Sequence, residues 1–245
     1  VPMSATTFGV DAPASLAAFR TGTGLPNALP RVGPLVINEI MYHPPSVVGT
    51  NDNSHDEYIE LANITASAVP LYDPVAPTNT WSLRGGASFT FPQGVSCPAN
   101  GFITVVPFDP VGDPASLASF KAKYGVPAGA LVYGPYSGKL DNFIDTVRIE
   151  RPDPPQEPPH PDVGFVPQII LDEIHYLNVA PWMPGADGTG LSLQRINASS
   201  YGNDPVNWVD ATPSPGSGNG LSSGTPPSIS SQPVTQTVNV GAPVS

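Results

Sequence analysis

The chain is short of charged residues, and above all of basic ones. Charged residues make up 12% of its 245 positions, about half the ~25% of an ordinary soluble protein. Nine Lys and Arg stand against 20 Asp and Glu, giving a net charge of −11. Surfaces that bind nucleic acid or anionic membranes need clustered Lys and Arg, and the sequence holds no such cluster. We therefore exclude nucleic acid as a partner.

Cysteine and long apolar runs are also scarce. The single Cys97 excludes an intramolecular disulfide and a thiolate zinc site. We interpret it as a small buried hydrophobe, with pairing to another chain as the alternative. No apolar run approaches the ~20 residues of a membrane span, so no membrane insertion is expected. Because the sequence begins at Val1 rather than Met, we expect a processed chain or a piece of a longer one.

Proline and glycine are abundant instead. With 33 Pro and 24 Gly, the composition disfavours long helices and favours short strands joined by turns. Apolar residues reach 40% and fall into strand-sized runs, which predicts an ordered all-β fold. The predicted strands are 35–42, 57–62, 80–84, 87–91, 102–106, 145–151, 168–176, 191–196 and 206–210.

One short helix is predicted over 114–124, inside a loop insertion. Asp113 is a suitable N-cap, Pro114 suits the first helical position, and Gly125 ends the pattern. A similar run at 13–19 predicts a second helical turn. Two such short matches are either an echo of two related units or convergence on one good capping sequence.

The positions of the Pro-, Gly- and Ser-rich segments predict one folded domain with extended ends. Residues 1–34 are expected to be an extended linker with a short helix, leaving an upstream unit, and 35–216 a β-sandwich. The run Pro213–Gly220 is rich in Pro, Gly and Ser, which predicts a flexible linker, placed at 217–225. Residues 226–245 are expected to hold one isolated strand.

Five motifs in order carry a family resemblance. Val36–Tyr42, Asp56–Asn63, Trp81–Leu83, Phe89–Pro92 and Phe102–Val106 resemble the strand motifs of the lamin-tail domain. The resemblance implies an immunoglobulin-like β-sandwich of the type found in nuclear lamins and in large secreted bacterial proteins. The basic surface of lamins is missing, so their nuclear roles do not transfer. Residues 226–245 resemble the first strand of a bacterial Ig-like domain.

Few residues suggest catalysis. Glu39 and Glu60 lie on strands predicted to be neighbours, and paired carboxylates can act as acid and base on a sugar. The alternative, which we favour, is a structural role with hydrogen bonds to the backbone or to solvent. The histidines lack metal-ligand spacing, and neither a nucleophile elbow nor a phosphate-binding loop is present. These histidines are His43, His55, His160 and His175.

Calcium is the one small ligand that the sequence suggests. Asn51, Asp52, Asn53 and Asp56 form an oxygen-rich loop on an acidic chain, and calcium takes six to eight oxygen ligands. Asp109 with Asp113, and Asp187 near Gly188, are weaker candidates. Asn and Asp also form ordinary turns, which is the competing interpretation. No other cofactor is expected.

Three functions are open to such a chain. The first is a non-enzymatic extracellular or cell-surface module for adhesion, spacing or protein–protein contact. The second is a self-assembling fibre subunit, in which the terminal strand pairs with the sheet edge of another copy. That strand would use Val234, Thr235, Thr237, Val238 and Val240. The third is a carbohydrate-binding module with an exposed aromatic platform. Its candidate residues are Tyr133, Tyr136, Trp182 and Trp208, although Trp208, like Trp81, is also a core candidate.

Overall fold

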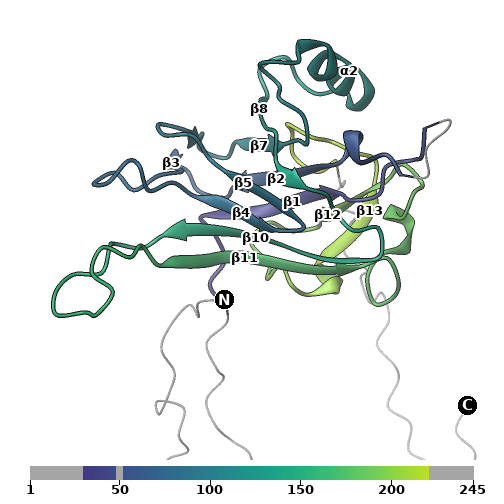
Figure 1. Cartoon of the computed structure of the whole chain (residues 1–245). Coiled ribbons are helices and arrows are strands. Elements are labelled where there is room, and N and C mark those ends of the chain that lie inside the picture. The colour runs from purple at the N-terminus through teal and green to yellow at the C-terminus, as the bar shows by residue number, and fades with distance from the viewer. Residues whose placement is uncertain (1–29, 48–51, 221–245) are drawn as a thin grey trace, which may run out of the picture.

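Two β-sheets packed face to face form the body of the protein, as a computed structural model shows (Figure 1). The structure describes residues 30–47 and 52–220. These residues confirm the predicted all-β sandwich with one short helix. All nine predicted strands are present, with ends that differ by at most two residues. Within these residues, no helix combines the length and apolarity needed to cross a membrane.

The first sheet has six strands with β1 and β2 at its centre. All of its neighbouring strands are antiparallel except β7 and β8, which are parallel. In spatial order the strands are β13 (Trp208–Ala211), β12 (Ser192–Arg195), β1 (Leu35–Met41), β2 (Tyr58–Asn63), β7 (Phe102–Val105) and β8 (Leu131–Tyr133).

The second sheet has five strands and is dominated by one long hairpin. Its strands are β11 (Gln168–Leu177), β10 (Ile144–Pro152), β4 (Ser82–Gly85), β5 (Ala87–Thr90) and β9 (Ser137–Gly138). The β10–β11 hairpin extends past the body and ends in the proline-rich loop (Figure 1). Smaller elements are the pair β3 (Val69–Pro70) and β6 (Ser96–Cys97), and the 3-10 turns η1 (Ser54–Asp56), η2 (Pro184–Ala186) and η3 (Pro205–Asn207).

A β-bulge in β1 decides which side chains face the core. The register between β1 and β2 shifts between Ile37 and Glu39. Ile37 and Ile40 therefore both join the main core, although three positions separate them, and Glu39 is turned to the outer face. Without the bulge, the two-residue repeat of a strand would place Glu39 on the same face as Ile37.

The helix α2 (Pro114–Tyr124) covers part of the outer face of the first sheet. It begins where the Asp113 side chain accepts a hydrogen bond from Ser116 N at 3.0 Å, and it ends at Gly125 with φ of 64°. These are the predicted caps. A second apolar cluster joins α2 and its flanking loops to β1 and β2, through residues that include Met41, Tyr58, Phe120 and Val126.

Sequence patterns missed four strands and misjudged the C-terminal run. β3, β6, β8 and β9 have two or three residues each, too few to produce a period. Residues Thr212–Asn219, here called the strap, overlap the predicted flexible linker but hydrogen-bond to β1, β2 and β12. Within the strap, Pro215 is buried. The predicted helix at 13–19 lies outside the described residues.

Candidate functional site

A row of four buried polar side chains crosses the outer face of the first sheet. The strand register places Gln194, Glu39, Glu60 and Thr104 side by side on β12, β1, β2 and β7. All four are fully buried. Burying a charge costs free energy unless the charge is paired and hydrogen-bonded. This row is therefore the place on the sheet where a functional site is most to be expected.

Glu39 is surrounded by hydrogen-bond donors. Tyr58 Oη, Ser192 Oγ at 2.5 Å and Gln194 Nε2 at 3.2 Å donate to it from the sheet. Ser214 of the strap donates from its backbone N at 3.0 Å and from its Oγ at 3.1 Å. Such donors replace the water that burial removes. Glu39 thus ties three strands to the strap.

Glu60 has fewer partners than Glu39. It accepts from Asn38 Nδ2 at 2.8 Å and from the strap's Gly216 N at 2.5 Å. Burial raises the pKa of Glu60 well above its usual range, and the neighbouring Glu39 raises it further. The folded protein therefore holds a proton on Glu60 more readily than the unfolded chain does.

The strap closes this pair off from solvent. Beyond Glu60, the strap's Asn219 donates to Asn38 O at 3.1 Å and to Arg195 O at 2.8 Å. Acid–base catalysis by two carboxylates needs a cleft that admits a substrate. Here the carboxylate oxygens face the protein's own donors, which agrees with the structural interpretation of Glu39 and Glu60.

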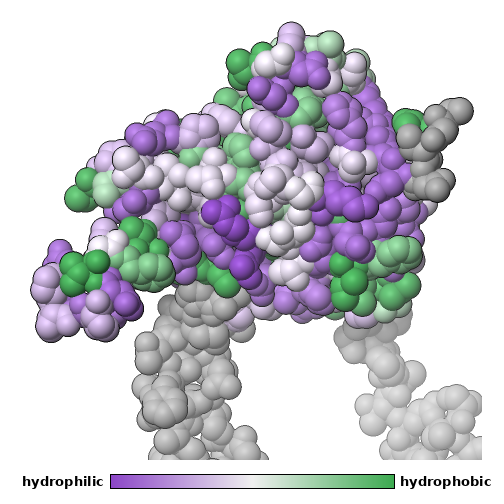
Figure 2. Space-filling model, viewed as in Figure 1, coloured by the Kyte–Doolittle hydropathy of each residue, from purple (hydrophilic) through white to green (hydrophobic). Residues whose placement is uncertain are grey.

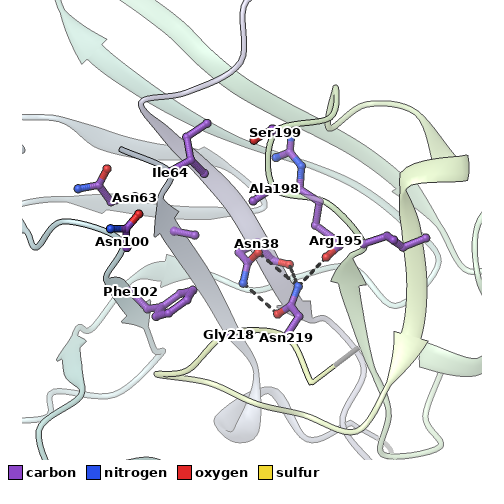
Figure 3. Close-up of a pocket in the computed structure, with 12 residues that line it drawn as sticks. Asn38, Asn63, Ile64, Asn100, Phe102, Arg195, Ala198, Ser199, Gly218 and Asn219 are labelled. Carbon is purple, nitrogen blue, oxygen red and sulfur yellow. Dashed lines mark hydrogen bonds between the residues drawn. The ribbon is translucent and has the colours of Figure 1, made fainter. Parts of the chain in front are cut away.

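A shallow pocket of about 350 Å³ lies beside the strap (Figure 3). Asn38, Asn63, Asn100 and Asn219 line it with amides, and Phe102 adds an aromatic ring. Neither glutamate of the buried pair lines this pocket. Asn63 donates to the carbonyls of Ser67, Cys97 and Pro98, so its amide belongs to the fold. The pocket therefore brings no acid–base pair together.

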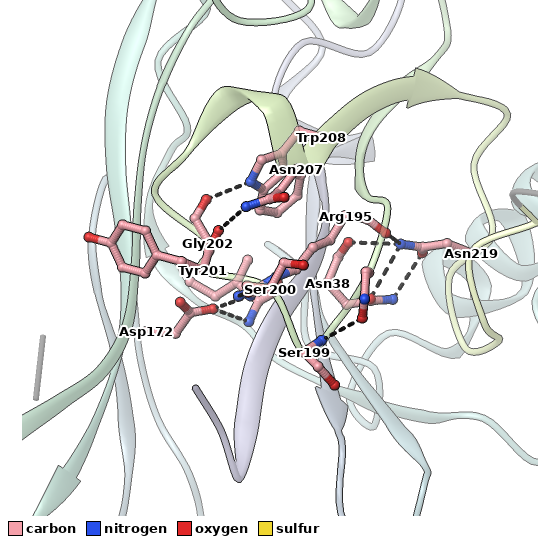
Figure 4. A network of polar contacts seen from close by, with 12 residues as sticks. Asn38, Asp172, Arg195, Ser199, Ser200, Tyr201, Gly202, Asn207, Trp208 and Asn219 are labelled. Carbon is pink, nitrogen blue, oxygen red and sulfur yellow. Dashed lines mark hydrogen bonds and ion pairs between the residues drawn. The ribbon is translucent and has the colours of Figure 1, made fainter. Parts of the chain in front are cut away.

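A buried ion pair holds the two sheets together (Figure 4). Arg195 on β12 and Asp172 on β11 approach to 2.5 Å, with side chains 0% and 5% exposed. Arg195 also donates to Ile37 O at 3.0 Å and to Ser200 O. Asp172 accepts from Ile37 N at 2.9 Å. No local pattern marked these residues, because the partners come from different sheets.

The structure places the carboxylates of the predicted calcium loop in separate ion pairs with lysines. Asp52 pairs with Lys139 at 2.6 Å, and Asp56 pairs with Lys123 at 2.5 Å. Asn53 donates to Asp56 and to Pro45 O. The carboxylates were expected to converge on a cation, but separate lysines neutralise them. In the described part of the chain, no three His, Cys, Asp or Glu are grouped to hold a metal. Asn51 lies outside that part.

The weaker calcium candidates also have structural roles. Asp109 accepts hydrogen bonds from Val111 N and Gly112 N, both at 2.9 Å, and Asp113 caps α2. Asp187 pairs with His43 at 2.5 Å and accepts from Asn178 at 3.0 Å. Asn and Asp therefore act here as turn and cap residues, the competing interpretation of their abundance.

Glu57 is a further buried carboxylate that the sequence analysis overlooked. It accepts from Tyr136 Oη at 2.7 Å and from Leu140 N at 2.9 Å, while its Oε1 has no partner. Burial raises the pKa of Glu57 to about 7, although both hydrogen bonds lower it. This group therefore titrates near neutral pH and must be separated from Glu60 in any pH experiment.

The proposed aromatic platform for carbohydrate does not exist. Tyr136, Trp182 and Trp208 are buried in the main core, and Tyr133 packs against it. The prediction of exposed rings is wrong for Tyr136, Trp182 and Trp208, Tyr133 is half-buried, and the core interpretation of Trp81 and Trp208 is confirmed. Buried in the core, these aromatic side chains contribute a large apolar area to the packing of the sandwich.

Other predicted residues divide between the fold and the undescribed ends. Cys97 is a free, buried thiol, as expected of a small core residue, and burial raises its pKa to about 11. His175 and His55 make hydrogen bonds to hydroxyls of the chain. The strand candidates Val234, Thr235, Thr237, Val238 and Val240 lie outside the described residues.

No protein-family model and no curated protein matches the chain.

Proposed function

We propose that the chain is a non-enzymatic structural module that mediates protein–protein contact or spacing, outside the cell or at its surface. The observation that carries this proposal is the β10–β11 hairpin, which exposes apolar side chains at both of its ends. The most chemically promising group, Glu39 with Glu60, is closed by the protein itself. The exposed apolar surfaces are therefore better candidates for function than the enclosed carboxylates.

The first contact surface, here called the hairpin-base patch, consists of Phe143, Ile144 and Val179. Their exposed fractions are 68%, 49% and 53%. They are neighbours, because Asn178 N donates to Phe143 O at 2.9 Å across the hairpin. Apolar residues gather in the lower right of Figure 2, at this end of the hairpin. Contiguous exposed apolar groups typically mark interaction sites.

The second surface lies at the opposite end of the same hairpin. Val163 and Phe165, in the loop between β10 and β11, are 59% and 61% exposed. The proline-rich sequence around them restricts the loop backbone, which lowers the entropy lost on binding. A hairpin with an apolar contact at each end suits a module that touches one neighbour on either side.

The charge around the hairpin-base patch indicates the chemistry of its partner. Asp141 and Asp145 flank Phe143 and Ile144, and neither forms an ion pair within the described residues. A partner with apolar side chains bordered by Lys or Arg would complement this surface. With nine Lys and Arg against 20 Asp and Glu, the chain is poorly suited to supply that basic border itself.

Kinship with the lamin-tail domain is part of the proposal. The five motifs fall on or beside β1, β2, β4, β5 and β7, so each coincides with a strand of the sandwich. That coincidence supports the proposed kinship, as does the two-layer architecture. Extracellular placement is proposed on the same resemblance.

Photo-crosslinking should locate the contacts. A photoreactive phenylalanine analogue at position 143 or 165 is expected to give a discrete crosslinked product, on cells of the producing organism or with added chain. The same analogue at Val111, which is 89% exposed but outside both surfaces, is the control. Crosslinks of equal yield from all three positions, or from none, would contradict the proposal.

A further inference from the structure

Two buried carboxylates hold the middle of the strap, while Gln194 binds Thr212 O at one end and Asn219 binds the body at the other. Ser214 donates twice to Glu39, and Gly216 N donates to Glu60 at 2.5 Å. Asn219 adds bonds to Asn38 and to Arg195 O. Seven residues of Pro, Gly, Ser and Asn, 213–219, have little apolar area to bury, so these polar contacts decide whether the strap stays in place.

Two adjacent buried carboxylates are unfavourable if both are charged. Glu39 and Glu60 are 0% exposed and directly opposite each other on β1 and β2. Within the described residues, neither forms an ion pair with Lys, Arg or His. Within 30–47 and 52–220, no cationic side chain therefore offsets the second charge.

Thr104, the neighbour of Glu60 on the other side, leaves the Glu60 carboxylate without a further donor. It lies opposite Glu60 on β7 and is 0% exposed, yet its Oγ1 has no hydrogen-bond partner. Buried hydroxyls nearly always have a partner. The Thr104 hydroxyl, however, does not donate to Glu60, so this neighbour on β7 does nothing to favour the charged form of Glu60.

We propose that the Glu39–Glu60 pair is a proton-binding site, and that the bound proton fastens the strap Thr212–Asn219 to the sheet. The ligand is a single proton, and Glu60 is the member of the pair that carries it. When it leaves as the pH rises, two charges repel each other beneath the strap, and the strap loosens. The position of the chain that follows Gly220 then depends on pH.

The sign follows from linkage. Burial and the neighbouring Glu39 raise the pKa of Glu60 in the folded state by more than the hydrogen bonds from Asn38 and Gly216 lower it. The stabilising effect of the proton is therefore complete below the ordinary glutamic acid pKa. The effect is lost as the pH rises through the folded-state pKa. The other titratable groups that face the pair are Tyr58, Tyr124 and Cys97. Burial raises the pKa of all three, so they stay neutral while Glu60 titrates.

Amide hydrogen exchange of the strap tests the proposal. All samples carry Glu57→Gln, which removes the other raised carboxylate. We expect exchange at Ser214 and Gly216, corrected for intrinsic rates, to accelerate at least about tenfold as the pH is raised until Glu60 loses its proton. With Glu60→Gln added, the side chain stays neutral and the acceleration should vanish. Equal acceleration in both proteins would overturn the proposal.

A second measurement requires no substitution in the pair. Carbon NMR of labelled glutamate carboxyls in the unmodified protein reports the charge of Glu60 directly. We expect Glu60 to be protonated at about pH 6, where ordinary glutamates are ionised. An ionised Glu60 at that pH would overturn the proposal, even if Glu60→Gln failed to fold.

Discussion

Replacing Arg195 with Met should lower the free energy of unfolding by about 3–5 kcal/mol, the range measured when one partner of a buried ion pair is removed. The substitution leaves Asp172 buried without its cation, and it leaves Ile37 O and Ser200 O without a donor. Urea denaturation followed by circular dichroism measures the change. The loss should be large because the pair joins β12 of one sheet to β11 of the other.

Arg151→Met is the matched control for this experiment. Arg151 and Asp153 are 3.9 Å apart, with side chains 36% and 40% exposed. Pairs this exposed contribute at most about 1 kcal/mol. If Arg195→Met is no more destabilising than Arg151→Met, the buried pair does not hold the sheets together.

The second large loss should come from Trp208→Ala, which we expect to destabilise the protein by about 3–5 kcal/mol. Trp208 is 1% exposed and packs against Trp182, with 6.1 Å between ring centroids. Its Nε1 donates to Gly202 O at 2.6 Å, a bond that Ala also removes. Denaturation followed through near-ultraviolet circular dichroism measures the change.

Val206→Ala, two positions away and 74% exposed, is the control for Trp208→Ala and should change stability by less than about 0.5 kcal/mol. Trp208 and Arg195 are in contact, with 6.0 Å from the guanidinium carbon to the ring. Their combined loss should therefore differ from the sum of the two single losses. Equal effects of Trp208→Ala and Val206→Ala would contradict the assignment of Trp208 to the core.

The sequence predicted the strands because strand periods are local. Val147 and Ile149 alternate with polar neighbours, and both are buried in β10 as expected. The bulge at Asn38 escaped prediction, since nothing in Val36–Met41 marks the extra residue. As a result, the pairing of Glu39 with Glu60 was predicted, but the outward direction of Glu39 and its burial beneath the strap were not.

Residues that meet across long separations explain the other failures. The strap has a linker's composition, but Ser214 meets Glu39 across 175 positions and Gly216 meets Glu60 across 156. Similarly, Asp52 meets Lys139 across 87 positions, which replaces the expected calcium site with an ion pair. The composition of a segment predicts only its local conformational preference. It could not predict these contacts, because they form between residues that only the tertiary fold brings together.

The most direct test of the proposed function compares how two variants of the chain bind to partners. One variant lacks apolar side chains on the two hairpin surfaces, and the other lacks exposed apolar side chains elsewhere. The variant F143S/F165S removes one aromatic ring from each end of the hairpin. The control V75S/V111S removes two side chains that are 93% and 89% exposed but lie outside both surfaces. Labelled protein is titrated onto cells of the producing organism and onto beads coated with the chain. We expect the unmodified protein and V75S/V111S to bind equally, and F143S/F165S to bind at least about tenfold more weakly. Equal binding by both variants, or no binding by the unmodified protein to either surface, would contradict a contact function for this hairpin.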